Sequence, residues 1–111
     1  MQRLILSGLL FCFFLLPVLD LSAQSSAMRR ANKEYELNQF KEAIDSYQKV
    51  VRKEPENVEA VSKLADCYRL LNDLEEAAEW YQRALSMPGL DPIHVFHYGG
   101  VLKSLQRYDE A

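Results

Sequence analysis

Two histidines, His94 and His97, come nearest to a chemical site in this sequence. They stand three residues apart, so on a helix they would share a face, and imidazole is a common metal ligand. Two ligands make an incomplete site, and no cysteine or acidic residue lies at ligand spacing from them. We therefore predict that both histidines face a groove or the surface, and we predict no metal.

The other residue types capable of chemistry fit structural roles. Gly99-Gly100 falls within a helical pattern, so it is not a phosphate-binding loop. No serine, cysteine or acidic residue stands in a nucleophile motif. The acidic run that includes Glu75, Glu76 and Glu79 opens a helix, where negative charge suits the helix dipole. The sequence therefore predicts no enzyme, no cofactor and no small-molecule substrate.

Charge and cysteine content narrow the function further. The chain has 13 Lys or Arg against 16 Asp or Glu, a net charge of −3, and the two signs are interspersed. Binding to nucleic acid needs clustered positive charge against phosphates, so we exclude it. Of the two cysteines, Cys12 lies in an apolar run and Cys67 on a helix. For Cys67 we expect partial burial as a small apolar residue, with a reactive or intermolecular thiol as the alternative.

Residues 1–23 have the pattern of a secretory signal peptide: Arg3, an apolar run from Leu4 to Leu16, and a small residue at the end. Cleavage after Ala23 or after Ala27 is open. The alternative is a retained anchor, but a membrane-spanning helix needs about 20 apolar residues, and this run is shorter. We predict export to the periplasm or outer membrane of a Gram-negative bacterium, with membrane contact only through this signal or through downstream domains.

The elements that would position all these residues repeat along the chain. Small, large apolar and aromatic residues recur with a spacing of 34, which is the signature of a helical repeat array. The recurring sets are Ala31, Ala65 and Gly99; Phe40, Leu74 and Tyr108; Ala43, Ala77 and Ala111; and Tyr47 with Tyr81. Small residues let two helices approach closely, so each unit should be a helix hairpin.

Turn residues place the helix ends. Asn38-Gln39, Asn72-Asp73 and Gln106-Arg107 read as two-residue turns inside the hairpins. Asp73 with Glu76 forms a capping-box pattern, and Asp91 before Pro92 is a second N-cap. No segment alternates like a strand. The predicted helices cover 26–37, 40–53, 58–71, 74–86 and 92–105.

The segment from Leu64 to Leu85 resembles a tetratricopeptide repeat almost throughout. The family's signature positions fall on Ala65, Tyr68, Leu74, Ala77, Tyr81 and Ala84. The resemblance implies an all-α solenoid of antiparallel hairpins, with repeats at 24–57 and 58–91 and an incomplete third at 92–111. It also implies a scaffold that binds another protein or peptide and is not an enzyme.

A signal peptide followed by such repeats is similar to the start of certain OmpA-family envelope proteins of Bacteroidetes. In those proteins a propeller and a peptidoglycan-binding domain follow, and some members serve type IX secretion. The last helix has apolar residues without an expected partner helix, among them Val95 and Leu102. We therefore interpret the sequence as the N-terminal part of a longer protein. The alternative is a regulatory or substrate-recruiting module attached to a downstream exported enzyme domain.

The resemblance places a binding groove along the first helix of each hairpin. Its predicted lining is Met28, Asn32, Tyr35, Ser62, Lys63, Asp66, Arg69, Phe96, His97 and Lys103. This mixture of basic, amide and aromatic side chains suits an extended peptide or a partner helix. The clamp with which some relatives hold a chaperone C-terminus needs paired Lys and Asn residues. Only Asn32 stands at such a position, so we do not expect that ligand.

Overall fold

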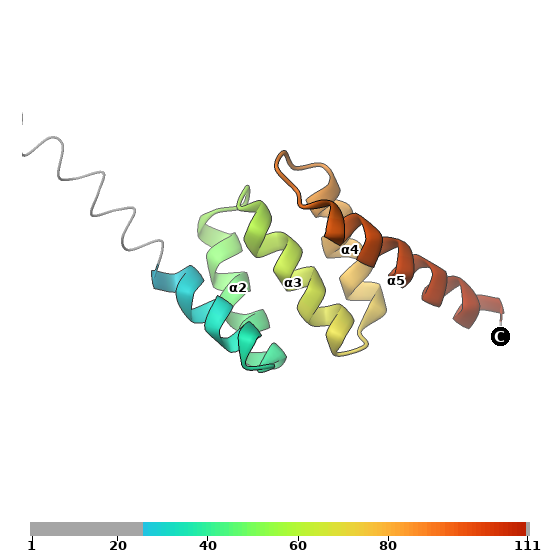
Figure 1. The fold of residues 1–111 in the computed structure, drawn as a ribbon, viewed down its shortest axis with the longest axis horizontal. Helices are drawn as coiled ribbons and strands as arrows, with labels where there is room; N and C mark the ends of the chain where they lie inside the picture. Colours follow the sequence, from blue (N-terminus) through green and yellow to red (C-terminus); the bar gives the residue numbers. More distant parts are fainter. Residues whose placement is uncertain (1–25, 111) are drawn as a thin grey trace, which may run out of the picture.

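The computed structural model describes residues 26–110, and all of its regular structure is helical. The predicted signal peptide therefore lies outside the described residues, as does Ala111. Five helices follow one another in chain order across Figure 1. They cover residues 26–36, α2 (Phe40–Lys53), α3 (Val58–Leu70), α4 (Leu74–Leu85) and α5 (Pro92–Glu110). None of the described helices combines the length and apolarity that a membrane crossing requires.

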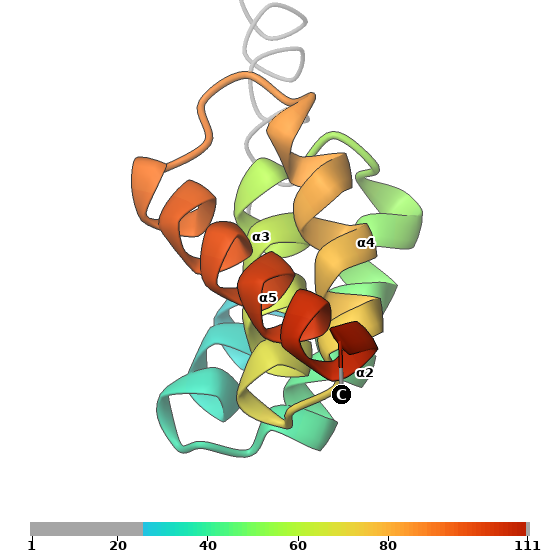
Figure 2. The ribbon, with the colours of Figure 1, turned by 90° about the vertical axis from the view of Figure 1, so that its right-hand side faces the viewer.

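Consecutive helices pack as antiparallel pairs, which confirms the predicted all-α architecture. α3 lies between α2 and α4 and contacts both (Figure 1). Figure 2 looks along the array from its C-terminal end and shows α5 lying across α3 and α4, both of which it contacts. Each helix is therefore held mainly by its chain neighbours, as expected for a repeat array.

The recurring small and aromatic residues form the core. Ala31, Ala43, Ala65 and Ala77 are fully buried where the helices approach most closely. Tyr47 lies in the first of two core clusters, and its counterpart Tyr81 lies in the second. The 34-residue pattern thus marks equivalent positions in two successive hairpins, as the sequence predicts.

The turn inside each complete hairpin depends on one asparagine. Asn38 and Asn72 have φ values of 59° and 62°, a left-handed conformation that asparagine tolerates better than most residues. The backbone N–H of the following residue, Gln39 or Asp73, reaches back to the carbonyl of Glu34 or Tyr68 at 2.9 Å. This pattern closes the C-terminus of a helix and reverses the chain.

The turn predicted at Gln106-Arg107 is wrong, because α5 continues without a break to Glu110. Gln106 occupies the position of Asn38 and Asn72 in the third unit. Its longer side chain lacks the local hydrogen bonding that lets asparagine adopt positive φ. Glutamine is also a good helix former. The third unit therefore has no residue that favours a chain reversal at this point.

Two of the four described helices that follow an acidic or amide residue are capped by the side chain of that residue. Asp91 accepts from the backbone N–H of Ile93 at 3.0 Å, as predicted, and Asn57 caps α3 by accepting from Ala60 at 3.1 Å. The capping box predicted at Asp73 is wrong, since its side chain makes no cap hydrogen bond. Asp73 also closes the preceding helix, and its ψ of 78° departs from the extended conformation of a good N-cap.

Gly99 has a different environment from its counterparts in the first two units. We predicted a close helix approach there, yet a methyl group added at Gly99 would meet no atom within 4 Å. Gly99→Ala should therefore raise the free energy of unfolding by about 0.5–1 kcal/mol, because alanine loses less backbone entropy in a helix. Thermal unfolding followed by circular dichroism measures this. A lower melting temperature would mean that another element contacts this face of α5.

Candidate functional site

The groove is the surface formed by the ten predicted residues on the first helix, α3 and α5. Its N-terminal part is ordered by Asn32. The hydroxyl of Tyr47 donates to Asn32 Oδ1 at 2.5 Å, and Lys63 Nζ donates to the same oxygen at 3.0 Å. Lys63 Nζ also lies 5.7 Å from the centre of the Tyr35 ring. The structure therefore brings three predicted groove residues together.

Asp66 occupies the equivalent position in the second unit. Tyr81 donates a hydrogen bond to Asp66 Oδ1, and the Tyr35 hydroxyl lies 3.5 Å from Oδ2. Arg69 donates to the Tyr81 hydroxyl at 3.0 Å and has a second nitrogen 3.9 Å from Oδ1. Asp66 is 3 % exposed, so this carboxylate organises the floor of the groove and is not one of its exposed groups.

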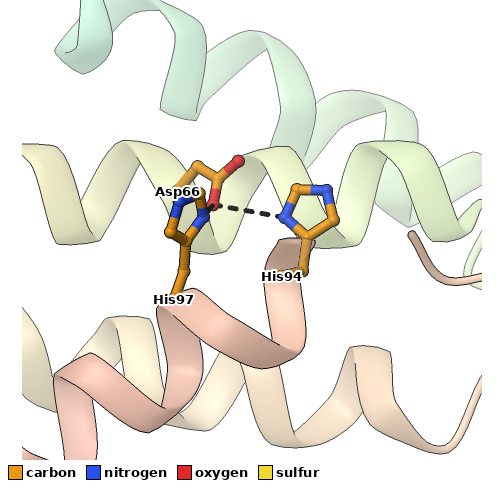
Figure 3. A group of neighbouring side chains, drawn as sticks. All are labelled: Asp66, His94 and His97. Carbon is orange, nitrogen blue, oxygen red and sulfur yellow. Dashed lines mark hydrogen bonds and ion pairs between the residues drawn. The ribbon is translucent and has the colours of Figure 1, made fainter. Parts of the chain in front are cut away.

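Both histidines of α5 meet Asp66, which the sequence analysis missed (Figure 3). His94 Nδ1 lies 3.3 Å from Asp66 Oδ1 and His97 Nδ1 lies 3.5 Å from it. The prediction that no acidic residue accompanies the histidines is therefore wrong. Asp66 precedes His94 by 28 residues, and only the packing of α5 against α3 brings it there.

The 34-residue register is the signal that identifies this contact. In the first unit the hydroxyl of Tyr47 and the ammonium of Lys63 meet at Asn32. One repeat later, the residues at these positions are Tyr81, His97 and Asp66, and they converge in the same arrangement, although His97 Nδ1 makes no hydrogen bond to Asp66. The contact between the second and third units thus has the same arrangement as the contact between the first and second units, with different chemistry. A carboxylate replaces the amide, and an imidazole replaces the ammonium.

The exposed part of the groove lies on α3 and α5. Phe96 is 76 % exposed, and Lys103, two turns later on α5, is exposed as well. Arg69, Phe96 and His97 help to line a hollow of about 310 Å³. An aromatic ring and a guanidinium therefore line one hollow, and an ammonium is exposed two turns further along α5.

Two predicted groove residues have other surroundings. Ser62 is 2 % exposed and its hydroxyl donates to the carbonyl of Glu59 at 3.1 Å, so the prediction that it faces a ligand is wrong. Met28 is partly buried against the first core cluster and contributes mainly to packing.

Burial and the Asp66 carboxylate keep the nearby hydroxyl and thiol groups protonated. Burial raises the pKa of Tyr81, and its hydrogen bond to Asp66 adds to the effect. Burial raises the pKa of Tyr35 as well, again assisted by Asp66. For Cys67, burial followed by the Asp66 charge raises the pKa to about 12. Cys67 is fully buried, so the packing role holds and the reactive-thiol alternative is wrong.

A second hollow, of about 500 Å³, lies between α2 and α4. Its lining includes Trp80, which is partly buried against the first core cluster. The guanidinium of Arg83 lies 5.2 Å from the centre of the Trp80 ring. The remaining lining residues are Gln48, Val51, Arg52 and Pro55. These residues do not form a recognisable catalytic or ligand-binding arrangement.

Comparison with known families agrees with the hairpin architecture. The tetratricopeptide repeat family model matches residues 28–92, which is more than half of the chain. None of the curated proteins compared with the chain matches it. Repeats of this family generally bind proteins or peptides and typically act as non-catalytic scaffolds. The matched range covers both complete hairpins, and on this evidence the chain belongs to the tetratricopeptide repeat family.

Proposed function

We propose that this protein is a non-catalytic scaffold that binds another protein in the groove of the first helix, α3 and α5. The observation that carries the proposal is Phe96, a large aromatic side chain that is 76 % exposed on the groove side of α5. Aromatic side chains, phenylalanine included, are enriched at protein interfaces relative to the rest of the surface. Beside it lies the hollow that Arg69 and His97 help to line.

The charges of the groove indicate the kind of partner. Its only acidic residue, Asp66, is buried and hydrogen-bonded, while Lys63, Arg69 and Lys103 are at least partly exposed. Glu59 offsets part of the charge of Lys63 through an ion pair at 3.0 Å. The accessible surface is therefore basic and aromatic, although the whole chain has a net charge of −3. A segment with acidic and apolar residues, extended or helical, is the matching ligand.

We further propose that the scaffold works in the bacterial cell envelope, as the N-terminal part of an OmpA-family protein associated with type IX secretion. The support is the signal-peptide pattern of residues 1–23 followed directly by the repeats. Fractionation of the source cells tests the location. Coding sequence beyond Ala111 tests the rest: a propeller and a peptidoglycan-binding domain would agree, whereas a catalytic domain would favour a recruiting module of an exported enzyme.

Site-specific photo-crosslinking tests the groove in the source cells. A photoreactive amino acid at Phe96 or at Lys103 should crosslink to a partner protein, while the same amino acid at Val95 should not. Val95 is the matched control because it lies on α5 and is 49 % exposed. Phe96→Asp should weaken capture of the identified partner at least roughly tenfold, the scale of an interface hot spot. Equal crosslinking from positions 95 and 96 would contradict the groove assignment.

A further inference from the structure

Three potential metal ligands converge where α5 crosses α3. Asp66 on α3 and His94 and His97 in the first two turns of α5 place one ligand atom each within 4.8 Å of one another. Figure 3 shows both imidazole rings turned toward the carboxylate. Within the described residues this is the one group of three or more acidic, histidine or cysteine side chains with this arrangement.

Two of the three distances between the ligand atoms match the edges of a coordination polyhedron. Metal–ligand bonds of about 2.0–2.2 Å at tetrahedral angles hold neighbouring ligand atoms roughly 3.3–3.6 Å apart. His94 Nδ1 lies 3.3 Å and His97 Nδ1 lies 3.5 Å from Asp66 Oδ1. The ligand atoms of the two histidines lie within 4.8 Å of each other, so an ion bound to all three residues would draw the two rings together around it.

Hydrogen bonding leaves one of these nitrogens without a partner. Asp66 Oδ1 already accepts from Tyr81 and lies within hydrogen-bond distance of His94. His97 Nδ1 is buried and makes no hydrogen bond within the part of the chain that the structure describes. Leaving a buried polar atom unpaired is unfavourable, and buried polar groups are normally satisfied. A cation between the two rings would supply the missing partner.

The residues at the three equivalent positions differ between the two repeat units, and this difference also favours a metal site. The first unit has Asn32, Ala60 and Lys63 at the positions where the second has Asp66, His94 and His97. None of the three first-unit residues is a usual metal ligand, whereas all three second-unit residues are. The residues of the first unit already hold two units together, because Lys63 and Tyr47 both donate hydrogen bonds to Asn32. Packing between units therefore does not by itself require a carboxylate and two histidines.

We propose that Asp66, His94 and His97 form a binding site for a divalent transition-metal ion, with Zn²⁺ as the closest match. Two imidazoles and one carboxylate suit zinc and its neighbours better than Mg²⁺ or Ca²⁺, which prefer oxygen ligands. Three protein ligands leave a coordination position for water or for a group of a bound partner. Tyr81 and Tyr35 hold the carboxylate in place, while the nearby charge of Arg69 opposes the ion and limits its affinity.

Titration of the protein with Co²⁺ and Zn²⁺, without any partner, tests this site. Cobalt absorption bands should saturate at one ion per chain, and Zn²⁺ should displace the cobalt. His97→Gln should weaken binding by at least roughly 100-fold, since loss of a ligand should exceed the 10–100-fold effect of losing an outer contact. His94 and His97 are the only histidines of the chain, so imidazole ligation cannot come from elsewhere in it.

The first repeat unit provides the matched control. A triple variant, Asp66→Asn, His94→Ala and His97→Lys, installs the first unit's residues in the second and should fold like the parent without binding the ion. Glu75→Gln, which neutralises an exposed acidic residue of α4, should keep the parent affinity. Absence of saturable binding up to millimolar Zn²⁺, or unchanged affinity in His97→Gln, would overturn the site. Either result would leave the proposed partner groove untouched, because that test does not use metal.

Discussion

Tyr81→Ala should lower the free energy of unfolding by about 3–5 kcal/mol, while Tyr81→Phe should lower it by only about 2 kcal/mol. Tyr81 is 1 % exposed and lies in the second core cluster with Ala65, Ala77 and Val101. Truncating a buried aromatic residue to alanine costs about 3–5 kcal/mol. A chain with roughly 85 ordered residues is stabilised by about 4–13 kcal/mol in total, so this loss removes between about a quarter and all of its stability.

The phenylalanine variant isolates the hydroxyl group, and Tyr47→Phe is its matched control. Tyr81 donates to the carboxylate of Asp66, whereas Tyr47 donates to the neutral amide of Asn32. Hydrogen bonds to charged groups contribute about 1.5–3 kcal/mol, against about 1 kcal/mol for neutral pairs. Asn32 also keeps Lys63 as a donor when the Tyr47 hydroxyl is removed.

Urea unfolding of the parent and the two phenylalanine variants measures this difference. We expect Tyr81→Phe to lose about 1 kcal/mol more than Tyr47→Phe, although both remove one oxygen from a buried ring. Equal losses would show that the hydrogen bond to the Asp66 carboxylate is no stronger than the hydrogen bond to the Asn32 amide. A larger loss for Tyr47→Phe would reverse the assignment of the stronger bond.

The helices could be predicted because each sequence signal depends on local structure. Alanines and tyrosines 34 residues apart fix which faces meet, and Asn38 and Asn72 fix where the chain reverses. The same logic failed at Gln106, where the repeat register predicts a turn and the residue itself favours a helix. At this position the conformational preference of the residue itself determines whether the chain turns or the helix continues.

The site was predicted only in part, because contacts between units depend on how the helices cross. Phe96 and Lys103 are exposed on α5, as a groove residue must be, but Ser62 is buried. The approach of His94 and His97 to Asp66 spans two hairpins and has no local signal. This contact can be predicted from the sequence only if Asn32 and Asp66 are recognised as equivalent positions. The residues that contact each of them must then be compared one repeat apart.

The stability of the chain should fall steeply above about pH 9, since three fully or almost fully buried groups must stay protonated in the fold. Burial raises the pKa of Cys67 from its ordinary value of 9.0 to about 12. It also raises the pKa of Tyr47 and of Tyr81 above the ordinary value of 10.0. In each case the unfolded chain releases its proton at a lower pH than the folded chain does.

The sign of the effect follows from this difference. Below about pH 9 these groups are protonated in both states and add no pH dependence. As the pH rises past each unfolded-state pKa, the unfolded state gains about 1.4 kcal/mol per pH unit and per group, until the folded-state pKa is reached. Near pH 11 the combined loss should be roughly 5–6 kcal/mol, a large part of the roughly 4–13 kcal/mol expected for a chain of this size.

Urea unfolding in buffers from about pH 8 to about pH 11 measures the loss, and tyrosinate absorbance follows ionisation in the same samples. Tyr47→Phe provides the control: it removes one titrating group, so its free energy of unfolding should fall less steeply above about pH 10 than that of the parent. Tyrosinate absorbance from Tyr47 and Tyr81 should appear together with unfolding. Ionisation of these tyrosines near pH 10 in a chain that keeps its helical circular dichroism would contradict their burial, because a folded core cannot accommodate the phenolate charge without solvent.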